Sequence, residues 1–263
     1  MALRRFRPPA SWEGLGFAPR FVYCGASMQV AFDQFDDERF SFHEDQVLIL
    51  DQVWSAADRL EFQRAMREAP WTSLRDNSRL AVTFPYCGNW LKADLMHSQR
   101  RRLLDRLSLS CITRYIESFP NIAGRHVNFN YYSYAAGDCL RTHDDIAQDQ
   151  ASADMMLRPT PMRRLAMVTY LHDEWEPDWG GELVIYDMGE GRRDQSVFTV
   201  THCIPPKPGS LVLFTVPRYH RVCRIDELCG AAKRLSIAGW FMTEHQPCTI
   251  TTAALQQVCA PRK

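Results

Sequence analysis

The sequence has little that would direct it to nucleic acid or into a membrane. Lys and Arg together number 31, as do Asp and Glu, so the formal net charge is zero. Proteins that coat nucleic acid or anionic lipid carry a basic excess, which this chain lacks. It also has no run near the roughly 20 apolar residues that a membrane helix requires. We therefore expect neither nucleic acid nor a membrane among its partners.

Paired cysteines and a secretory leader are also missing. The nine cysteines are odd in number, scattered and without a C-x-x-C pair, which argues against a disulfide framework and a structural zinc site. The start, MALRRFRPPASWEG, is basic but lacks the apolar segment of a secretory signal. Its arginines leave an organellar presequence open, although two prolines would interrupt an amphipathic helix. We expect a cytoplasmic protein with mostly buried free thiols.

The first half of the sequence predicts an N-terminal arm followed by a strand and two helices. The apolar share of 46% is sufficient for a packed core. Residues 1–45 show no clear period and are expected to pack on the body as an arm. A strand follows at QVLILDQVWS, and Ser55 with Asp58 predicts a capping box that opens a helix. A second helix is expected from about Ser98 to Ser118, where apolar residues recur at helical spacing.

From about residue 124, short β-rich runs alternate with Gly, Pro and Asp. These runs are RHVNFNYYSYAAG, RRLAMVTYLH, GGELVIYD, QSVFTVTHCI, GSLVLFTV and RLSIAGWFM. Many short strands after two helices favour a sandwich or jelly roll with helices packed outside over parallel βαβ units. We expect an α+β, mainly β fold with one domain over 46–245, comprising helical support at 56–120 and a jelly-roll core at 124–243, followed by a tail at 246–263.

Two histidines and an aspartate are candidates for a metal site. In CLRTHDDIAQ, His143 and Asp145 are two residues apart, and on an extended strand both would point to one face. Such a pair is common in solvated turns, so a second histidine is needed, and His220 follows the strand in PGSLVLFTVPRY. Two histidines and one carboxylate leave coordination positions open, as a non-haem Fe(II) oxygenase requires. His172 and Glu174 have the same spacing and are the internal alternative.

A carboxylate clamp is predicted downstream of His220. Arg234 lies fourteen residues further on, and Ser236 shares its face of a strand. A guanidinium binds a carboxylate through two parallel charge-assisted hydrogen bonds, and a hydroxyl adds a third donor. This pair suits the distal carboxylate of 2-oxoglutarate.

Neighbouring residues are expected to have structural roles. Asp144 should point away from His143, toward solvent or behind the metal ligands. Gly180 and Gly181 favour a tight turn or bulge, because no helix follows them to bind phosphate. Trp240, like the tryptophans at 175 and 179, is expected in the core or at its rim.

The motifs between about residues 128 and 243 resemble the Fe(II)- and 2-oxoglutarate-dependent dioxygenases, within them the prolyl-hydroxylase-like branch. The resemblance rests on YAAGDCLRTHDD, RRLAMVTYLHDEWEPDWGGELVIYD, PPKPGSLVLFTVPRYHRV and RLSIAGWF. These are most similar to the ribosomal-protein prolyl 3-hydroxylases. The resemblance implies a double-stranded β-helix, which is a cupin-like jelly roll, and a catalytic domain that uses Fe(II), 2-oxoglutarate and O₂, with ascorbate as an accessory reductant.

The resemblance also assigns roles to individual residues. Those expected to bind iron and form the catalytic centre are His143, Asp145 and His220. Those expected to bind the cosubstrate or line its pocket are Arg234, Tyr170, Ser236 and Tyr134. Related halogenases lack the carboxylate ligand, so Asp145 favours hydroxylation.

The substrate is the least determined part of this prediction. The resemblance implies hydroxylation of an aliphatic C–H bond in a prolyl or other amino-acid-type substrate, with succinate and CO₂ as co-products. A free amino acid or natural-product intermediate is the alternative small-molecule substrate. The stretch 146–162 is longer than expected for protein-modifying members and is predicted to be a mobile lid. A non-catalytic metal- or ligand-binding jelly roll is the alternative of another class, and it would have no need of a cosubstrate clamp.

Overall fold

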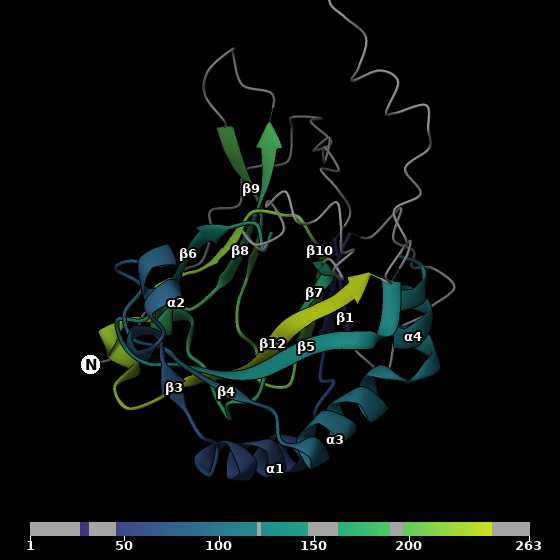
Figure 1. The fold of residues 1–263 in the computed structure, drawn as a ribbon, viewed down its shortest axis with the longest axis horizontal. Coiled ribbons are helices and arrows are strands. Elements are labelled where there is room, and N and C mark those ends of the chain that lie inside the picture. Colours follow the sequence, from purple (N-terminus) through teal and green to yellow (C-terminus); the bar gives the residue numbers. More distant parts are fainter. Residues whose placement is uncertain (1–26, 32–45, 120–121, 147–162, 190–196, 244–263) are drawn as a thin grey trace, which may run out of the picture.

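The computed structural model describes residues 27–31, 46–119, 122–146, 163–189 and 197–243. Within these ranges the chain forms two sheets, with helices on the outer side of the larger one (Figure 1). The larger sheet has the order β1 (Ser27–Ala31), β2 (Val47–Asp51), β10 (Leu211–Thr215), β7 (Arg163–Tyr170), β12 (Arg234–Thr243), β5 (Ile122–Tyr134), β4 (Leu91–Asp94) and β3 (Thr72–Ser73). The smaller sheet has the order β6 (Leu140–His143), β11 (His220–Val222), β8 (Leu183–Gly189) and β9 (Val197–Ile204).

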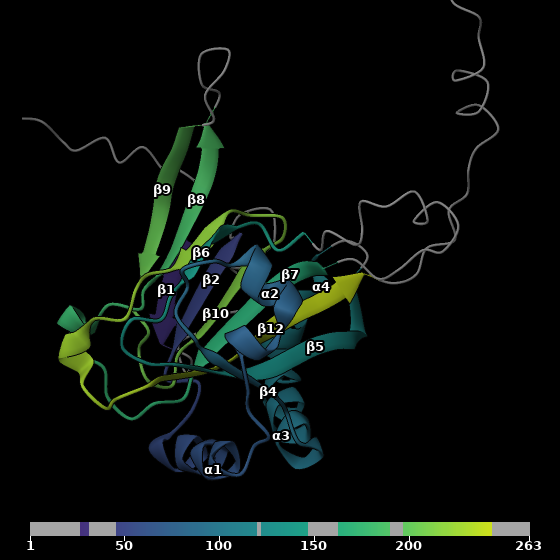
Figure 2. The same cartoon turned by 60° about the vertical axis from the view of Figure 1, so that its left-hand side comes forward.

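The strands pair as a jelly roll requires. Every pairing between named strands is antiparallel except β1 with β2, which is parallel. Strand β1 belongs to the stretch 1–45, where no strand was predicted, and it extends the sheet beyond β2. Figure 2 shows β8 and β9 continuing as a two-stranded ribbon past the rest of the smaller sheet. The mainly β architecture with helices outside is therefore confirmed.

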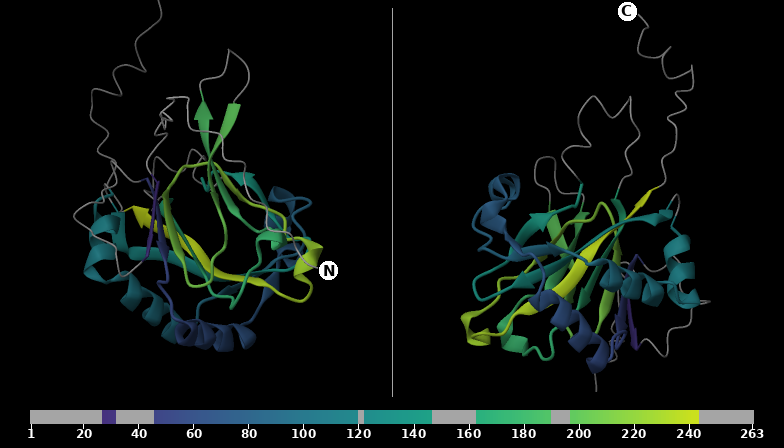
Figure 3. Two further views of the ribbon diagram at one scale, coloured as in Figure 1. Left: turned by 180° about the vertical axis from the view of Figure 1, so that it is seen from behind. Right: turned by 60° about the horizontal axis from the view of Figure 1, so that its bottom comes forward.

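Helices support the outer face of the larger sheet. Those packed on it are α1 (Ala56–Arg67), α3 (His97–Leu107) and α4 (Ser110–Glu117). The short helix α2 (Ser78–Thr83) buries none of its residues, and 3-10 turns lie at Leu74–Asp76, Pro177–Trp179 and Glu227–Cys229. Phe62 of α1, Leu103 of α3 and Tyr115 of α4 are buried in one cluster with sheet residues such as Ile237 and Phe241. In Figures 1 and 3, α1, α3 and α4 lie along the side of the larger sheet that faces away from β6 and β8, whereas α2 lies near β6.

The prediction of one helix from Ser98 to Ser118 was wrong. The helix ends at Leu107, and α4 begins at Ser110. The Ser108 hydroxyl donates to the Leu104 carbonyl oxygen at 2.6 Å, and Leu109 has an extended backbone that starts the next helix. Serine competes in this way for backbone partners and interrupts helices. The break was not visible in the apolar spacing, because both halves bury apolar residues in the same core.

A second apolar cluster fills the space between the sheets. It joins Val168, Val212 and Phe214 of the larger sheet to Leu183 and Ile185 of the smaller one. No helix in the described part of the chain is long and apolar enough to span a lipid bilayer. Five cysteines with described side chains are free, and three of these, Cys87, Cys139 and Cys229, are buried. Most of the expected arm, the stretch 147–162 and the expected tail lie outside the described residues.

The capping box at the start of α1 is confirmed and gives a stability prediction. The Ser55 hydroxyl accepts from the Asp58 backbone N–H, while the Asp58 carboxylate accepts from the Ser55 backbone N–H at 3.1 Å. Ser55→Ala should lower the free energy of unfolding by about 1 kcal/mol, because the Asp58 backbone N–H loses its acceptor and the Asp58 carboxylate loses the hydroxyl donor. Urea denaturation measures the change. Ser98→Ala, at an exposed site in α3, is the matched control and should leave stability within about 0.5 kcal/mol. Equal stability in both variants would contradict the capping role.

Candidate active site

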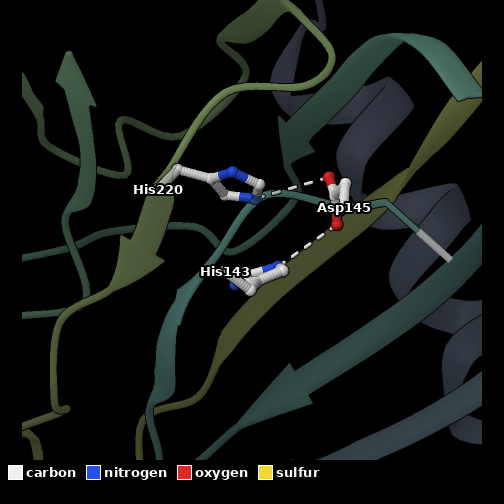
Figure 4. A group of neighbouring side chains, drawn as sticks. All are labelled: His143, Asp145 and His220. Atoms are coloured by element: carbon white, nitrogen blue, oxygen red, sulfur yellow. Dashed lines mark ion pairs between the residues drawn. The ribbon is translucent and has the colours of Figure 1, made fainter. Parts of the chain in front are cut away.

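His143, Asp145 and His220 meet where β6 and β11 pair (Figure 4). His143 is the last residue of β6, His220 is the first residue of β11, and the two are register partners. The Asp145 carboxylate lies between them, with Oδ1 3.2 Å from His143 Nε2 and Oδ2 3.4 Å from His220 Nε2. One candidate ligand atom from each residue lies within 4.8 Å of the others. The three predicted metal ligands are thus brought together.

Asp145 reaches this point through a turn, and the argument from strand alternation was wrong for it. Strand β6 ends at His143, and Asp145 has a left-handed backbone with φ of 63°. The Asp144 carboxylate accepts from the Ile146 backbone N–H at 3.1 Å, which closes a local Asx turn around Asp145. The spacing of two residues is correct, but the turn aims the carboxylate back at His143.

Both imidazoles are oriented by backbone carbonyls. His143 Nδ1 lies 2.8 Å from the Arg141 carbonyl oxygen, and His220 Nδ1 lies 2.8 Å from the Arg218 carbonyl oxygen. A carbonyl can only accept, so each Nδ1 carries a proton, and Nε2 is then the nitrogen that the neutral imidazole offers to a metal. Metal-binding histidines are commonly fixed by such a partner on the far ring nitrogen. Two imidazole nitrogens and one carboxylate also form the donor set that suits non-haem Fe(II), so the residues present fit an iron ion.

Electrostatics keep two of these groups in the protonation state that metal binding needs. The pKa of His220 is lowered to about 4, mainly by burial and next by the neighbouring His143, while Asp145 raises it by less. Burial alone would raise the pKa of Asp145, but His220, His143 and a hydrogen bond from Trp240 together hold it well below its usual range. Because metal ligands must be deprotonated, a neutral His220 and an ionised Asp145 are suited to bind a cation.

Arg234 is a fully buried guanidinium at the first position of β12. Only 2% of it is exposed. Its Nε donates to the Gly181 carbonyl oxygen at 2.9 Å, and an Nη lies 3.3 Å from the Tyr170 hydroxyl. The guanidinium carbon also lies 5.4 Å from the centre of the Tyr134 ring. Among the described residues no carboxylate forms an ion pair with Arg234, so its charge is buried without a counter-charge from them.

One cavity of about 1000 Å³ connects Arg234 to the metal ligands. Ser236 is buried on the same face of β12 as Arg234, and both line this cavity, as does Tyr134. Tyr170 contacts Arg234 but is not part of the cavity wall. The structure therefore brings together all the predicted cosubstrate residues, with Tyr170 behind the guanidinium.

Gly181 makes room for the guanidinium. Gly180 and Gly181 have φ of 69° and 76°, which confirms the predicted tight turn. A Cβ on Gly181 would lie 3.0 Å from Arg234 Cδ and 2.5 Å from Ile225 Cδ1. The glycine thus allows the chain to pass close to Arg234 and offer it a carbonyl oxygen.

The cavity also contains tryptophans that the sequence did not single out. Trp90 stacks on Tyr134 with ring centroids 5.8 Å apart, and its indole N–H has no partner among the described residues. Trp240 donates its indole N–H to Asp145 Oδ2 at 2.7 Å, so its placement as a core or rim residue was incomplete. One signal could have identified Trp240, because it shares the strand phase of Arg234 and Ser236.

The alternative metal pair does not assemble. His172 is buried, and its Nε2 contacts the Pro206 carbonyl oxygen at 2.7 Å. Glu174 is exposed. Within the described ranges, His143, Asp145 and His220 are the one group of metal-binding side chains that converge.

Comparisons with known proteins agree with this site. Residues 129–242 match the family model described as 2OG-Fe(II) oxygenase superfamily. Over 117 residues the chain is 29% identical to prolyl 3-hydroxylase OGFOD1 of Mus musculus, which is 44% of this chain and 18% of that protein. The match therefore spans under a fifth of the length of this curated relative.

Solved structures share the fold. A prolyl-4-hydroxylase from Pseudomonas putida aligns with a TM-score of 0.52 and 20% identity over 77% of this chain and 95% of that chain. A prolyl hydroxylase from Trichoplax adhaerens, in complex with a hypoxia inducible factor oxygen degradation domain peptide fragment, aligns with a TM-score of 0.50 and 18% identity over 78% and 87%. The predicted double-stranded β-helix is confirmed. The family match includes His143, Asp145, His220 and Arg234, so residues 129–242, which carry the candidate site, are those of a 2OG-Fe(II) oxygenase superfamily domain.

Proposed function

We propose that this chain is an Fe(II)- and 2-oxoglutarate-dependent hydroxylase of an aliphatic C–H bond in a prolyl or other amino-acid-type substrate. The observation that carries the proposal is that the convergent His143, Asp145 and His220 share one cavity with a buried Arg234. A metal-binding module without turnover would need the three ligands but not a second, cationic end to the cavity.

Each end of the cavity has a distinct task in this proposal. His143, Asp145 and His220 hold Fe(II), which with 2-oxoglutarate and O₂ supplies the oxidising chemistry that hydroxylates the substrate and releases succinate and CO₂. Three protein ligands leave coordination positions for the cosubstrate and O₂. Val168, Leu183 and Phe214 form an apolar part of the cavity wall, which favours the exclusion of water from the reacting atoms.

Arg234 binds the distal carboxylate of 2-oxoglutarate. A buried guanidinium without a carboxylate partner is costly, and an anionic ligand relieves that cost with charge-assisted hydrogen bonds. Ser236 adds a hydroxyl on the same face, Tyr134 forms the neighbouring wall, and Tyr170 fixes the guanidinium from behind. This arrangement orients the cosubstrate with its other end toward the metal ligands.

Relatives favour an amino-acid-type substrate. The mouse relative is named as a prolyl 3-hydroxylase, and the Trichoplax enzyme was solved with a peptide fragment. A cavity of about 1000 Å³ is at the upper end of the usual range for ligand sites, so it accommodates the cosubstrate together with a substrate side chain. A free amino acid is the second candidate substrate, because it also fits a cavity of this volume.

The test is to load the protein with Fe(II) and 2-oxoglutarate under nitrogen and then admit O₂. We expect succinate to form, and to form faster when proline-containing peptides or cell extract are added. Mass spectrometry should then find a product that has gained one oxygen atom, and its location on a peptide or a free metabolite decides the substrate class. If no succinate forms under any of these conditions, the proposed activity is wrong.

Gly181→Ala should weaken cosubstrate binding specifically. The added methyl meets Arg234 Cδ and Ile225 Cδ1 and should displace the guanidinium, so we expect the KM for 2-oxoglutarate to rise by about tenfold or more, which corresponds to about 1.4 kcal/mol. The matched control is Gly137→Ala, where φ is 84° but no atom lies within 4 Å of the new Cβ. Both variants should lose about 1–2 kcal/mol of stability from the left-handed backbone. A similar KM in the two variants would show that Gly181 serves the turn alone.

A further inference from the structure

Asp145 is held at two separate points by residues from two other strands. Its backbone carbonyl oxygen accepts from an Arg163 Nη at 3.0 Å, and its carboxylate Oδ2 accepts from Trp240 Nε1 at 2.7 Å. Arg163 opens β7, and Trp240 lies on β12. The Arg163 guanidinium carbon lies 3.6 Å from the centre of the Trp240 ring, so the two side chains also stack on each other. The main chain and the side chain of the aspartate are therefore fixed by one connected pair.

The backbone of Asp145 explains why such a pair is needed. With φ of 63° the residue is in the left-handed region, which costs a non-glycine residue about 1–2 kcal/mol. Strained backbone of this kind persists only where its surroundings hold it. Asp144 closes the turn from within the same segment. Among the described residues, the hydrogen bonds that join the Asp145 carbonyl and carboxylate to the larger sheet come from Arg163 and Trp240.

The sheet and their mutual contact restrict the positions of the Arg163 and Trp240 side chains. Trp240 pairs with Ala166 of β7, and Met242 pairs with Arg163 across a register shift, so the two side chains come from neighbouring strands within a few residues of each other. Both are half-buried and line the cavity. Guanidinium and indole planes attract each other through a cation–π interaction, so each side chain limits the rotamers of the other.

We propose that Arg163 and Trp240 are a positioning pair that holds Asp145 in the orientation required for metal binding. The inference rests on the proposed function, because it assigns Asp145 to the iron. Neither residue is a metal ligand. They act through Asp145: Trp240 engages one acceptor position of Oδ2, and Arg163 fixes the peptide group that carries the side chain. Partners of metal ligands that act in this way typically change metal affinity by about 10- to 100-fold.

The test is the affinity of the protein for Co(II), used as an air-stable probe for Fe(II). Trp240→Phe keeps an aromatic ring beside Arg163 and removes the indole N–H, and we expect it to weaken Co(II) binding by about 10- to 100-fold in calorimetric titration. Arg163→Met should weaken it in the same direction. The double variant should lose less than the product of the two single effects, because both act through one aspartate.

Trp71→Phe is the matched control. Trp71 is also half-buried and donates its indole N–H at 2.8 Å, to the Met66 carbonyl oxygen, far from the metal ligands in the fold. It should lose comparable thermal stability and bind Co(II) within about twofold of the wild type. Raising the Fe(II) concentration should restore much of the 2-oxoglutarate turnover of Trp240→Phe, which a general loss of structure would not allow.

The outcomes separate the inference from the proposed function. The positioning role is overturned if Trp240→Phe binds Co(II) within twofold of the wild type, or if Trp71→Phe loses as much Co(II) affinity as Trp240→Phe. In either case, 2-oxoglutarate turnover by the wild-type protein would still support the proposed function. A wild-type protein that binds no Co(II) overturns the proposed function and the inference with it. Selective weakening in Trp240→Phe and Arg163→Met with rescue by Fe(II) supports both.

Discussion

Replacement of any one of His143, Asp145 and His220 by alanine is expected to abolish 2-oxoglutarate turnover. The three ligand atoms lie within 4.8 Å of one another and no other described group of this kind converges, so the loss of one cannot be made good by a neighbour. The effect should exceed the roughly 100-fold upper figure for loss of a residue behind a ligand. Succinate formation and Co(II) affinity measure it, and both should fall together.

His97→Ala is the control for these variants. His97 is an exposed histidine at the start of α3, so its removal tests whether loss of any imidazole has the same result. We expect wild-type turnover from this variant and near-native thermal stability from all four. Turnover that persists in one of the three alanine variants would move the metal centre elsewhere.

Arg234→Leu is expected to raise the KM for 2-oxoglutarate by about 30- to 1000-fold, which corresponds to about 2–4 kcal/mol of lost charge-assisted hydrogen bonding. The value of kcat at saturating cosubstrate should change much less, since the metal ligands are intact. The apparent KM for the hydroxylated substrate should also change little. Steady-state kinetics with each substrate varied in turn measure the two constants.

Two further variants serve as controls for the KM of Arg234→Leu. Arg234→Lys keeps the charge but loses the planar fork, so its KM should fall between those of the wild type and Arg234→Leu. Arg67→Leu removes an exposed arginine from the end of α1 and should leave the KM unchanged. A KM for Arg234→Leu equal to that of the wild type would exclude the clamp.

The sequence was most informative where a residue's role depends on local features, such as strand phase or a helix cap. The shared phase of Arg234 and Ser236 predicted one face of one strand, and the structure places both on the cavity wall. The capping box of Ser55 and Asp58 was predicted from residues three positions apart, because its hydrogen bonds are local. Local pattern therefore predicted the face of β12 that lines the cavity and the start of α1.

Features that depend on tertiary contacts were not predicted. The turn at Asp145 requires partners from β7 and β12, which are distant in sequence, so the H-x-D spacing gave the right residues for the wrong geometric reason. The helix break at Ser108 depends on one side-chain hydrogen bond within an otherwise periodic segment. Strand β1 is formed by pairing with β2, a contact that the composition of its five residues does not signal. The predicted lid at 146–162 stays a prediction, since 147–162 lie outside the described residues.

Calorimetric titration of 2-oxoglutarate under nitrogen tests the central claim most directly, that the metal ligands and Arg234 form two ends of one cosubstrate site. Wild-type protein would be titrated with and without bound Co(II), beside Arg234→Leu with Co(II). We predict one molecule of 2-oxoglutarate per chain, with affinity that falls at least tenfold when Co(II) is removed and at least thirtyfold in Arg234→Leu. Binding of equal affinity with and without metal, or in wild type and Arg234→Leu, would contradict the account.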